Sequence, residues 1–250
     1  MFVYRRYSPS DFRRVKALIS SGSSDCEIAS ALKIPRSTAQ NWRLRDIPPR
    51  TLKPAPRVWR PSDGAAYSYL LGIYLGDGHI VGASRLDIYM DASYPAVVEE
   101  VERTIATAYP TSHTRRDSRP GSIRIVGSGV DWSKAIPQHG AGKKHERSIE
   151  LVDWQRALTE ANPEAFIRGL IHSDGCRCVN EFRTRLPSGR VASYSYPRYF
   201  FSNLSADIRR LFTDHCEQIG IRWTQSNHRN ISISHRASVA TLDEFVGPKS

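Results

Sequence analysis

The sequence predicts an α+β protein in which a duplicated domain with two antiparallel sheets follows a small all-α unit. Two segments of closely similar sequence, residues 70–78 and 167–175, open the two copies. Each segment is followed by the same alternation of strand-like and helical patterns. Residues 1–46 instead show three short helical patterns and no strand-like run. We therefore divide the chain into an N-terminal unit (1–46), a linker (47–64) and a duplicated domain (65–250), with repeats over about 65–140 and 160–250.

The N-terminal unit has a capping signal or a favourable first residue at the start of each helix. Ser10 can cap a helix over residues 11–20, and Ser24 followed by Glu27 forms a capping box for a second helix. Pro35 is a favoured first residue for a third helix over residues 35–45. We expect Ala39 and Trp42 to face the interior of this unit.

Two short helices joined by a tight turn, with the second opening on polar and basic residues, are typical of a helix-turn-helix. Side chains of this third helix can form paired hydrogen bonds with base edges in the major groove. The segment 24–42 also resembles the helix-turn-helix of resolvases and transposases. We expect DNA contacts from its exposed polar residues, although the pattern also suits a plain three-helix cap; they are Arg36, Ser37, Gln40, Asn41 and Arg43.

The charge of the chain indicates a polyanionic partner. The formal net charge is +11 and the pI is about 9.7, which favours nucleic acid over a merely solvated basic surface. Residues 1–64 hold thirteen basic and five acidic residues, so most of the excess lies there. Five prolines between residues 46 and 63 predict a stiff, basic linker.

The chain lacks the apolar segments that target or anchor proteins in membranes. It has no run of eighteen apolar residues and no signal-like N-terminus, and its four cysteines suit a reducing compartment. We therefore expect a cytoplasmic protein without a membrane partner. Zinc binding remained a weaker alternative, because the Cys176-x-Cys178 spacing and the separate His215-Cys216 pair differ from common zinc motifs.

The repeated segments predict two helices that pack closely and end in a carboxylate. Small residues four positions apart lie on one face of a helix and let two backbones approach; here they are Gly72 and Gly76 in one copy, Gly169 and Ser173 in the other. Gly78 and Gly175 are expected to act as C-caps. Asp77 and Asp174 would then lie together at the negative ends of two helix dipoles, which is unfavourable without a cation.

The remaining elements are expected in the same order in both copies. In the first, we expect a strand at 85–91, a helix at 95–108 and strands at 112–117 and 122–127. In the second, we expect strands at 177–185 and 190–202, a helix at 206–219, strands at 221–225 and 230–234, and a final helix at 237–245. Arginines on the uncovered sheet faces would contact DNA, interleaved with Tyr194 and Tyr196; they are Arg115, Arg124, Arg183, Arg185, Arg190, Arg198, Arg222 and Arg229.

Both glycine-aspartate helices resemble the LAGLIDADG motif of homing endonucleases, and the duplicated order is similar to their single-chain pseudo-dimers. The resemblance covers roughly residues 65–250 and implies two saddle-like sheets around a pseudo-two-fold axis. It implies a monomer that binds duplex DNA at specific sites and hydrolyses both strands with Mg²⁺ or another divalent cation. Asp77 and Asp174 would be the catalytic and metal-binding acids, with Gly76 and Ser173 beside the metal.

Two features separate this chain from the homing endonuclease pattern. The position two residues before each acid is Leu75 in one copy and His172 in the other, and no lysine or glutamine of a water pocket is identifiable. Lys134, Lys143 and Lys144 fall in or near a loop, and Gln225, His235 and Arg236 lie at strand ends of the second copy only. The loop 140–144 lacks the glycine and hydroxyl residue of a P-loop.

A second resemblance, to WhiA-type regulators, implies DNA binding without cleavage. Those regulators also combine a LAGLIDADG-like domain with a helix-turn-helix. In them the helix-turn-helix follows the LAGLIDADG part and the acidic pair tends to be lost, whereas this chain has the reverse order and keeps both acids. The sequence therefore favours an endonuclease and leaves a non-cleaving transcriptional regulator as the alternative.

Overall fold

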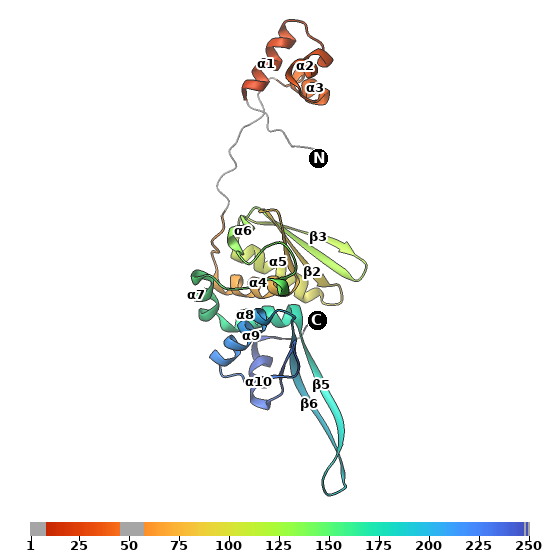
Figure 1. Cartoon of the computed structure of the whole chain (residues 1–250), viewed down its shortest axis with the longest axis vertical. Coiled ribbons are helices and arrows are strands. Elements are labelled where there is room, and N and C mark those ends of the chain that lie inside the picture. The colour runs from red at the N-terminus through yellow and green to blue at the C-terminus, as the bar shows by residue number, and fades with distance from the viewer. Residues whose placement is uncertain (1–8, 46–57, 248, 250) are drawn as a thin grey trace. The chain divides into compact units, whose positions relative to one another are not determined.

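The computed structural model describes residues 9–45, 58–247 and 249, which belong to two compact units (Figure 1). The first unit comprises residues 1–56 and the second residues 57–250. Most of the predicted linker, residues 47–57, lies outside the described residues, whereas residues 58–64 belong to the second unit.

The N-terminal unit contains three helices around a small apolar core. Helices α1 (Pro9–Ser20), α2 (Asp25–Leu32) and α3 (Arg36–Arg43) follow the predicted order. The capping box of Ser24 and Glu27 is present at α2, and Lys33 takes the left-handed conformation that ends this helix. Trp42 packs edge-on against the ring of Phe12, with 5.5 Å between ring centroids. These aromatic side chains hold α1 and α3 together.

The second unit contains two copies of one order of elements, as predicted. The first copy consists of α4 (Gly64–Asp77), β1 (Gly78–Val81), β2 (Arg85–Asp91), α5 (Pro95–Ala108), β3 (His113–Arg119) and β4 (Ser122–Ser128). The second consists of α8 (Pro163–Asp174), β5 (Gly175–Arg185), β6 (Val191–Ser202), α9 (Ala206–Gln218), β7 (Thr224–Gln225), β8 (Asn230–Ile233) and α10 (Arg236–Phe245).

The two sheets have equivalent topologies. Their strand orders are β1-β2-β4-β3 and β5-β6-β8-β7, and every pair is antiparallel. Between the copies lie α6 (Trp132–Ala135), the 3-10 turn η1 (Lys144–Glu146) and α7 (Asp153–Ala161). Within the described part of the chain, no helix is long and apolar enough to cross a membrane.

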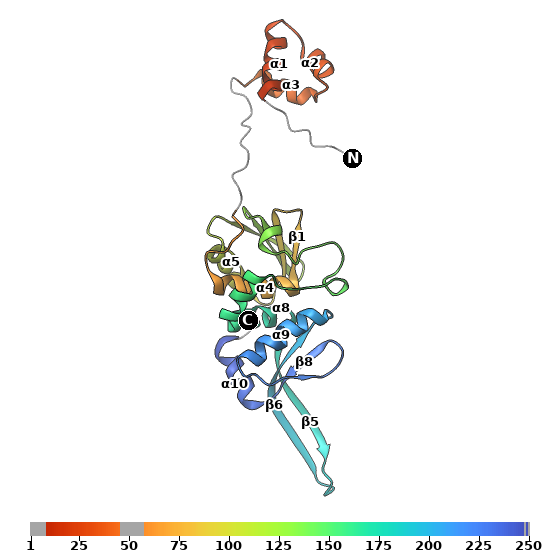
Figure 2. The same ribbon diagram turned by 60° about the vertical axis from the view of Figure 1, so that its left-hand side comes forward.

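Helices α4 and α8 pack against each other through their small residues (Figure 2). A Cβ atom on Gly72 would lie 2.6 Å from the backbone oxygen of Phe166. A Cβ atom on Gly169 would overlap the carbonyl oxygen of Tyr69. The Ser173 hydroxyl donates a hydrogen bond within its own helix to the carbonyl oxygen of Gly169, with 3.1 Å between the two oxygen atoms. The two helices are therefore in direct backbone contact at Gly72 and Gly169.

The glycines after the two aspartates, Gly78 and Gly175, are the C-cap residues of α4 and α8, as expected. Many C-cap glycines take the left-handed conformation, whereas these two are extended, with φ of −93° and −111°. A Cβ atom on Gly78 would lie 2.6 Å from the Cα atom of Tyr74, and one on Gly175 would lie 2.7 Å from the Cα atom of Ile171. Steric crowding where each helix turns directly into a strand explains the glycine.

His172 is buried in the interface of the motif helices and is 1% exposed. Its Nδ1 lies 2.9 Å from the hydroxyl of Tyr69, and its Nε2 lies 2.9 Å from the carbonyl oxygen of Val246. The Val246 oxygen can only accept, so the neutral ring donates from Nε2 and accepts from Tyr69 at Nδ1. Burial lowers the pKa of this imidazole from 6.5 to about 4.

We expect acid to destabilise the folded chain through His172. Because the folded-state pKa is depressed, stability is fully present above pH 6.5 and is lost as the pH falls toward 4, by roughly 3 kcal/mol for this shift. Urea unfolding of the wild type and of His172→Gln at pH 7 and pH 4.5 measures this loss in the free energy of unfolding. The loss between the two pH values should be smaller in the variant. Protonation of carboxylates affects both proteins, so its contribution cancels in the comparison. Equal losses would contradict this assignment.

Candidate metal centre and nucleic-acid surface

Asp77 and Asp174 end the two packed helices and lie beside one another. A Cβ atom on Gly76 would lie 3.0 Å from the Cγ atom of Asp174, which places that carboxylate against the other copy's helix. Burial, followed by the charge of Asp174, raises the pKa of Asp77 to about 6. Burial also raises the pKa of Asp174, opposed by a hydrogen bond of 2.6 Å from Asn203 Nδ2. The pair therefore concentrates two buried carboxylates at the ends of the motif helices.

Two lysines that the sequence did not identify as a pair reach this centre. Lys144 Nζ donates to the carbonyl oxygens of Tyr74 (2.5 Å) and Gly76 (2.9 Å). Lys249 Nζ donates to the carbonyl oxygens of Ser173 and Gly175, each at 3.2 Å. Gly76 and Ser173 are equivalent positions, directly before the two aspartates. The lysines thus follow the pseudo-symmetry of the acids at these two carbonyls, while their second carbonyl bonds, to Tyr74 and Gly175, differ.

Each lysine connects the two copies of the repeat. Lys144 is bound to the first motif helix, yet the charge of Asp174 is the main one that favours its ammonium form. Lys249 is bound to the second motif helix, and its chief favourable charge is that of Asp77. Burial outweighs both effects and lowers the pKa of each lysine, to about 8 for Lys144. Two crossed half-sites result, each with one carboxylate, one backbone carbonyl and one lysine.

The donor atoms of this centre fit a hard divalent cation. The carboxylates and the two carbonyl oxygens are the ligand types that Mg²⁺, Mn²⁺ and Ca²⁺ prefer. Mg²⁺ in particular is often held by only one or two protein carboxylates, with water and substrate phosphate completing its shell. Among the described residues, no cluster of three or more His, Cys, Asp or Glu side chains has metal-binding geometry. Water or phosphate oxygens would therefore complete the shell of a cation held here.

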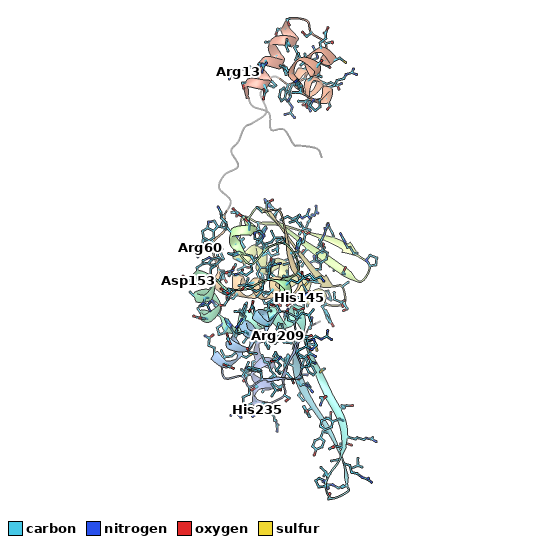
Figure 3. All side chains as sticks on the ribbon, viewed as in Figure 1. Arg13, Arg60, His145, Asp153, Arg209 and His235 are labelled. Atoms are coloured by element: carbon cyan, nitrogen blue, oxygen red, sulfur yellow. The ribbon has the colours of Figure 1, made fainter. Side chains whose placement is uncertain are left out.

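A cleft of about 490 Å³ opens beside Asp174. Residues from both copies line it, including His79 of β1 and Asn203 after β6. The segment between the copies supplies a cluster of nitrogen-bearing side chains, with His145 labelled in Figure 3. A phosphate next to the aspartates would meet positive charge here. The remaining basic or imidazole side chains of the lining are His139, Lys143, Lys144, Arg147 and Arg229.

On the first sheet, the predicted DNA-binding arginines lie on the outer face and are paired with acids. Asp117 of β3 forms ion pairs with two arginines. Arg115 lies two residues before it on the same strand, and Arg124 lies directly opposite it on β4. Arg124 also lies 3.6 Å from the carboxylate of Asp87, which Arg85 approaches at 3.1 Å. The network holds these guanidinium groups in place, so only part of their charge is available to a ligand.

On the second sheet, β5 and β6 continue beyond the other strands as a two-stranded ribbon (Figures 1 and 2). Arg198 lies on the uncovered face, where its guanidinium group is stacked on Phe200 and bound to Ser232. Since side chains alternate along a strand, Arg183 and Arg185 lie on the opposite face of the ribbon from Arg198. The predicted arginines therefore do not form one surface.

The ribbon face that carries Arg198 is aromatic farther out. Phe182 lies directly opposite Tyr194 in the register, with 5.2 Å between stacked rings, and Tyr196 follows on the same face. Phe182 is 43% exposed.

Arg190 lies in the turn between the strands, Arg222 lies before β7, and Arg229 lies in the cleft beside Asp174. Cys176 and Cys178 share the aromatic face, whereas Cys216 is buried in α9.

In the N-terminal unit, all five predicted DNA-contacting residues are exposed on α3; they are Arg36, Ser37, Gln40, Asn41 and Arg43. Arg43 is bound within the unit. Its Nε lies 2.8 Å from a carboxylate oxygen of Asp25, and it donates a second hydrogen bond to the carbonyl oxygen of Ser23. Arg43 thus joins α3 to the start of α2, which reduces its availability to DNA.

No model of a known protein family matches the sequence. No curated protein matches it either. Solved structures similar to the chain include the N-terminal LAGLIDADG domain of DUF199/WhiA, with 13% identity, a TM-score of 0.47, and coverage of 74% of this chain and 83% of that chain.

Two similar nuclease structures were solved with DNA. One is the LAGLIDADG meganuclease I-AabMI bound to uncleaved DNA, with 11% identity, a TM-score of 0.45, and coverage of 72% of this chain and 82% of that chain. The other is I-DmoI in complex with DNA and Mn, with 14% identity, a TM-score of 0.47, and coverage of 74% and 98%.

Proposed function

We propose that this protein binds duplex DNA and cleaves both strands in a reaction that depends on a divalent cation. The crossed arrangement of Asp77, Asp174, Lys144 and Lys249 carries the proposal. Two buried carboxylates with raised pKa values favour a bound cation, and two equivalent half-sites suit the two strands of a duplex. Mg²⁺ is the cation that we expect in the cell.

The residues of each half-site have distinct tasks in this proposal. Asp77 and Asp174 hold the cation against a phosphate, and Asn203 fixes the orientation of Asp174 through its amide hydrogen bond. When bound, the cation supplies Lewis-acid chemistry that activates a water molecule and stabilises the leaving oxygen. The lysine ammonium groups lie within reach of the negative charge that develops at the phosphate. The basic side chains of the cleft attract and orient the DNA backbone.

DNA would be contacted by both units. The uncovered sheet faces supply Arg115, Arg124 and Arg198, and the exposed side chains of α3 supply a separate reader for base edges. The formal net charge of +11 supports a partner of this kind. An internally duplicated unit needs no second copy to present two half-sites, so we propose a monomer.

The cleavage test uses supercoiled plasmids that carry a random-site library, with the full chain and Mg²⁺. Linear product with one defined junction would support the nuclease. Binding that is specific for sequence and weakens with salt, with neither nicked nor linear product, would leave the non-cleaving regulator instead. Failure to bind duplex DNA at low salt would contradict both functions.

Shortening the β5–β6 ribbon should remove protein contacts from one side of the bound DNA only. Replacement of residues 180–196 by Asn-Gly would join Val179 to Pro197, which are opposite each other in the register. The six residues 180–185 reach about 20 Å beyond that point, or about six base pairs. We expect hydroxyl-radical footprints in Ca²⁺ to lose roughly that length at one end. Arg115→Ser, in the other copy of the repeat, is the comparison variant, because it alters the first sheet and leaves the ribbon intact. Loss of footprint at both ends of the DNA site in the shortened variant would contradict the placement of the ribbon at one end.

A further inference from the structure

Lys144 and Lys249 donate hydrogen bonds to carbonyl oxygens that could serve as ligands of a cation at this centre. Lys144 Nζ lies 2.9 Å from the oxygen of Gly76, and Lys249 Nζ lies 3.2 Å from that of Ser173. Each of these carbonyls belongs to the residue directly before an aspartate, and the charges of both aspartates favour both ammonium groups. The ammonium groups therefore stand at carbonyl oxygens next to the two carboxylates.

The lysines are held there by further contacts that favour a positive charge. Lys144 Nζ lies over the ring of Tyr74, 4.8 Å from its centroid, and Lys249 Nζ lies over that of Tyr94 at 5.2 Å. These cation–π contacts add to two carbonyl hydrogen bonds for each ammonium group. In this arrangement the lysines neutralise the carboxylate pair of the metal-free protein.

An ammonium group and a divalent cation on one carbonyl oxygen repel each other. A divalent cation lies about 2.1–2.5 Å from its oxygen ligands, so the two positive centres would be within several ångströms of each other in a buried environment. Repulsion at such a distance exceeds the thermal energy several-fold. The lysine must therefore move before the cation can take its place.

We propose that Lys144 and Lys249 are built-in counter-cations that compete with the divalent metal for the Gly76 and Ser173 carbonyls and are displaced when it binds. The inference rests on the metal centre of the proposed function but not on cleavage. It assigns the lysines a task in the DNA-free protein: they keep the two carboxylates ionised and together. When the divalent cation binds, it displaces the two lysines from the carbonyls, so their ammonium groups become free only once the cation is present.

Calcium titration of the DNA-free chain tests the competition. Isothermal calorimetry compares wild type with Lys144→Met and Lys249→Met, and Lys134→Met is the matched control because its side chain is exposed and lies near Asp131. We expect each test variant to bind Ca²⁺ about tenfold more tightly or better, and the control to match the wild type. Unchanged or weaker binding in the test variants would overturn the proposal.

Two further measurements keep the test independent of variant folding and of cleavage. In the wild-type chain, the ¹³Cε resonances of Lys144 and Lys249 should shift on Ca²⁺ addition, while that of Lys134 should stay; absence of any shift would also overturn the proposal. Asp77→Asn with Asp174→Asn should abolish Ca²⁺ binding. If the wild type does not bind Ca²⁺, the metal centre itself is refuted, whereas binding that is insensitive to the lysines refutes only the competition.

Discussion

In the Asp77→Asn, Asp174→Asn double variant, we expect the rate of plasmid cleavage in Mg²⁺ to fall by about a thousandfold or more. A loss of that size corresponds to about 4 kcal/mol of transition-state stabilisation. Asparagine keeps the size of each side chain and removes the negative charge that would hold the cation. Since the arginine-bearing surfaces are unchanged, the affinity for the target duplex should change little. Single-turnover cleavage and a binding titration in Ca²⁺ measure the two effects separately.

The single variants distinguish the crossed half-sites from one shared site. If each carboxylate serves one strand, Asp77→Asn and Asp174→Asn should each produce mainly nicked circles, with the nick in opposite strands. The Asn203→Ala variant is a companion, because it retains both carboxylates while removing the hydrogen bond to Asp174 and the one that Asn203 Oδ1 accepts from the Ser205 N–H. Equal loss of both cuts in either single variant would show that the two half-sites do not act independently.

The acids and the small-residue faces of this centre could be predicted because they lie in one short, repeated segment. Helical spacing places Gly72 beside Gly76, and the repeat supplies the matching helix, so the sequence alone brings Asp77 and Asp174 together. The lysines could not be found in this way. Lys144 lies in an irregular segment after the first sheet and Lys249 lies after the last helix, and no periodic pattern relates the two. Only the folded backbone shows their equivalence.

The fold was predictable where one face of an element is buried along its length. The bounds of β2 and α5 match the expected ranges, because alternating and helical apolar patterns are complete in both. Three elements were not expected: β1 and α6 have only four residues each, and α7 is strongly polar. The arginines of the ribbon illustrate another limit, since basic residues on a two-stranded ribbon carry no signal of which face a ligand meets.

Substitutions at the helix interface should be the most damaging to folding, with an order set by what each new methyl group meets. In Gly169→Ala, the Cβ atom would overlap the carbonyl oxygen of Tyr69. This oxygen belongs to the backbone of α4, so it cannot move aside as a side chain could. We expect a loss of more than about 3 kcal/mol in the free energy of unfolding, or failure to fold. Gly140→Ala is the control, because its nearest neighbour would be a side-chain atom of Arg147 at 3.4 Å. Urea unfolding and soluble yield measure both.

Gly76→Ala should be damaging for a different reason and therefore reparable. Its Cβ atom would lie 2.5 Å from the Cβ atom of Ser173, which is a side-chain contact. The second substitution Ser173→Gly removes that atom and leaves Asp174 Cγ, at 3.0 Å, as the nearest neighbour. The double variant should regain most of the lost stability, whereas Ser173→Gly should not rescue Gly169→Ala, whose clash is with backbone. Rescue of both, or of neither, would show that the helices do not meet along the predicted small-residue faces.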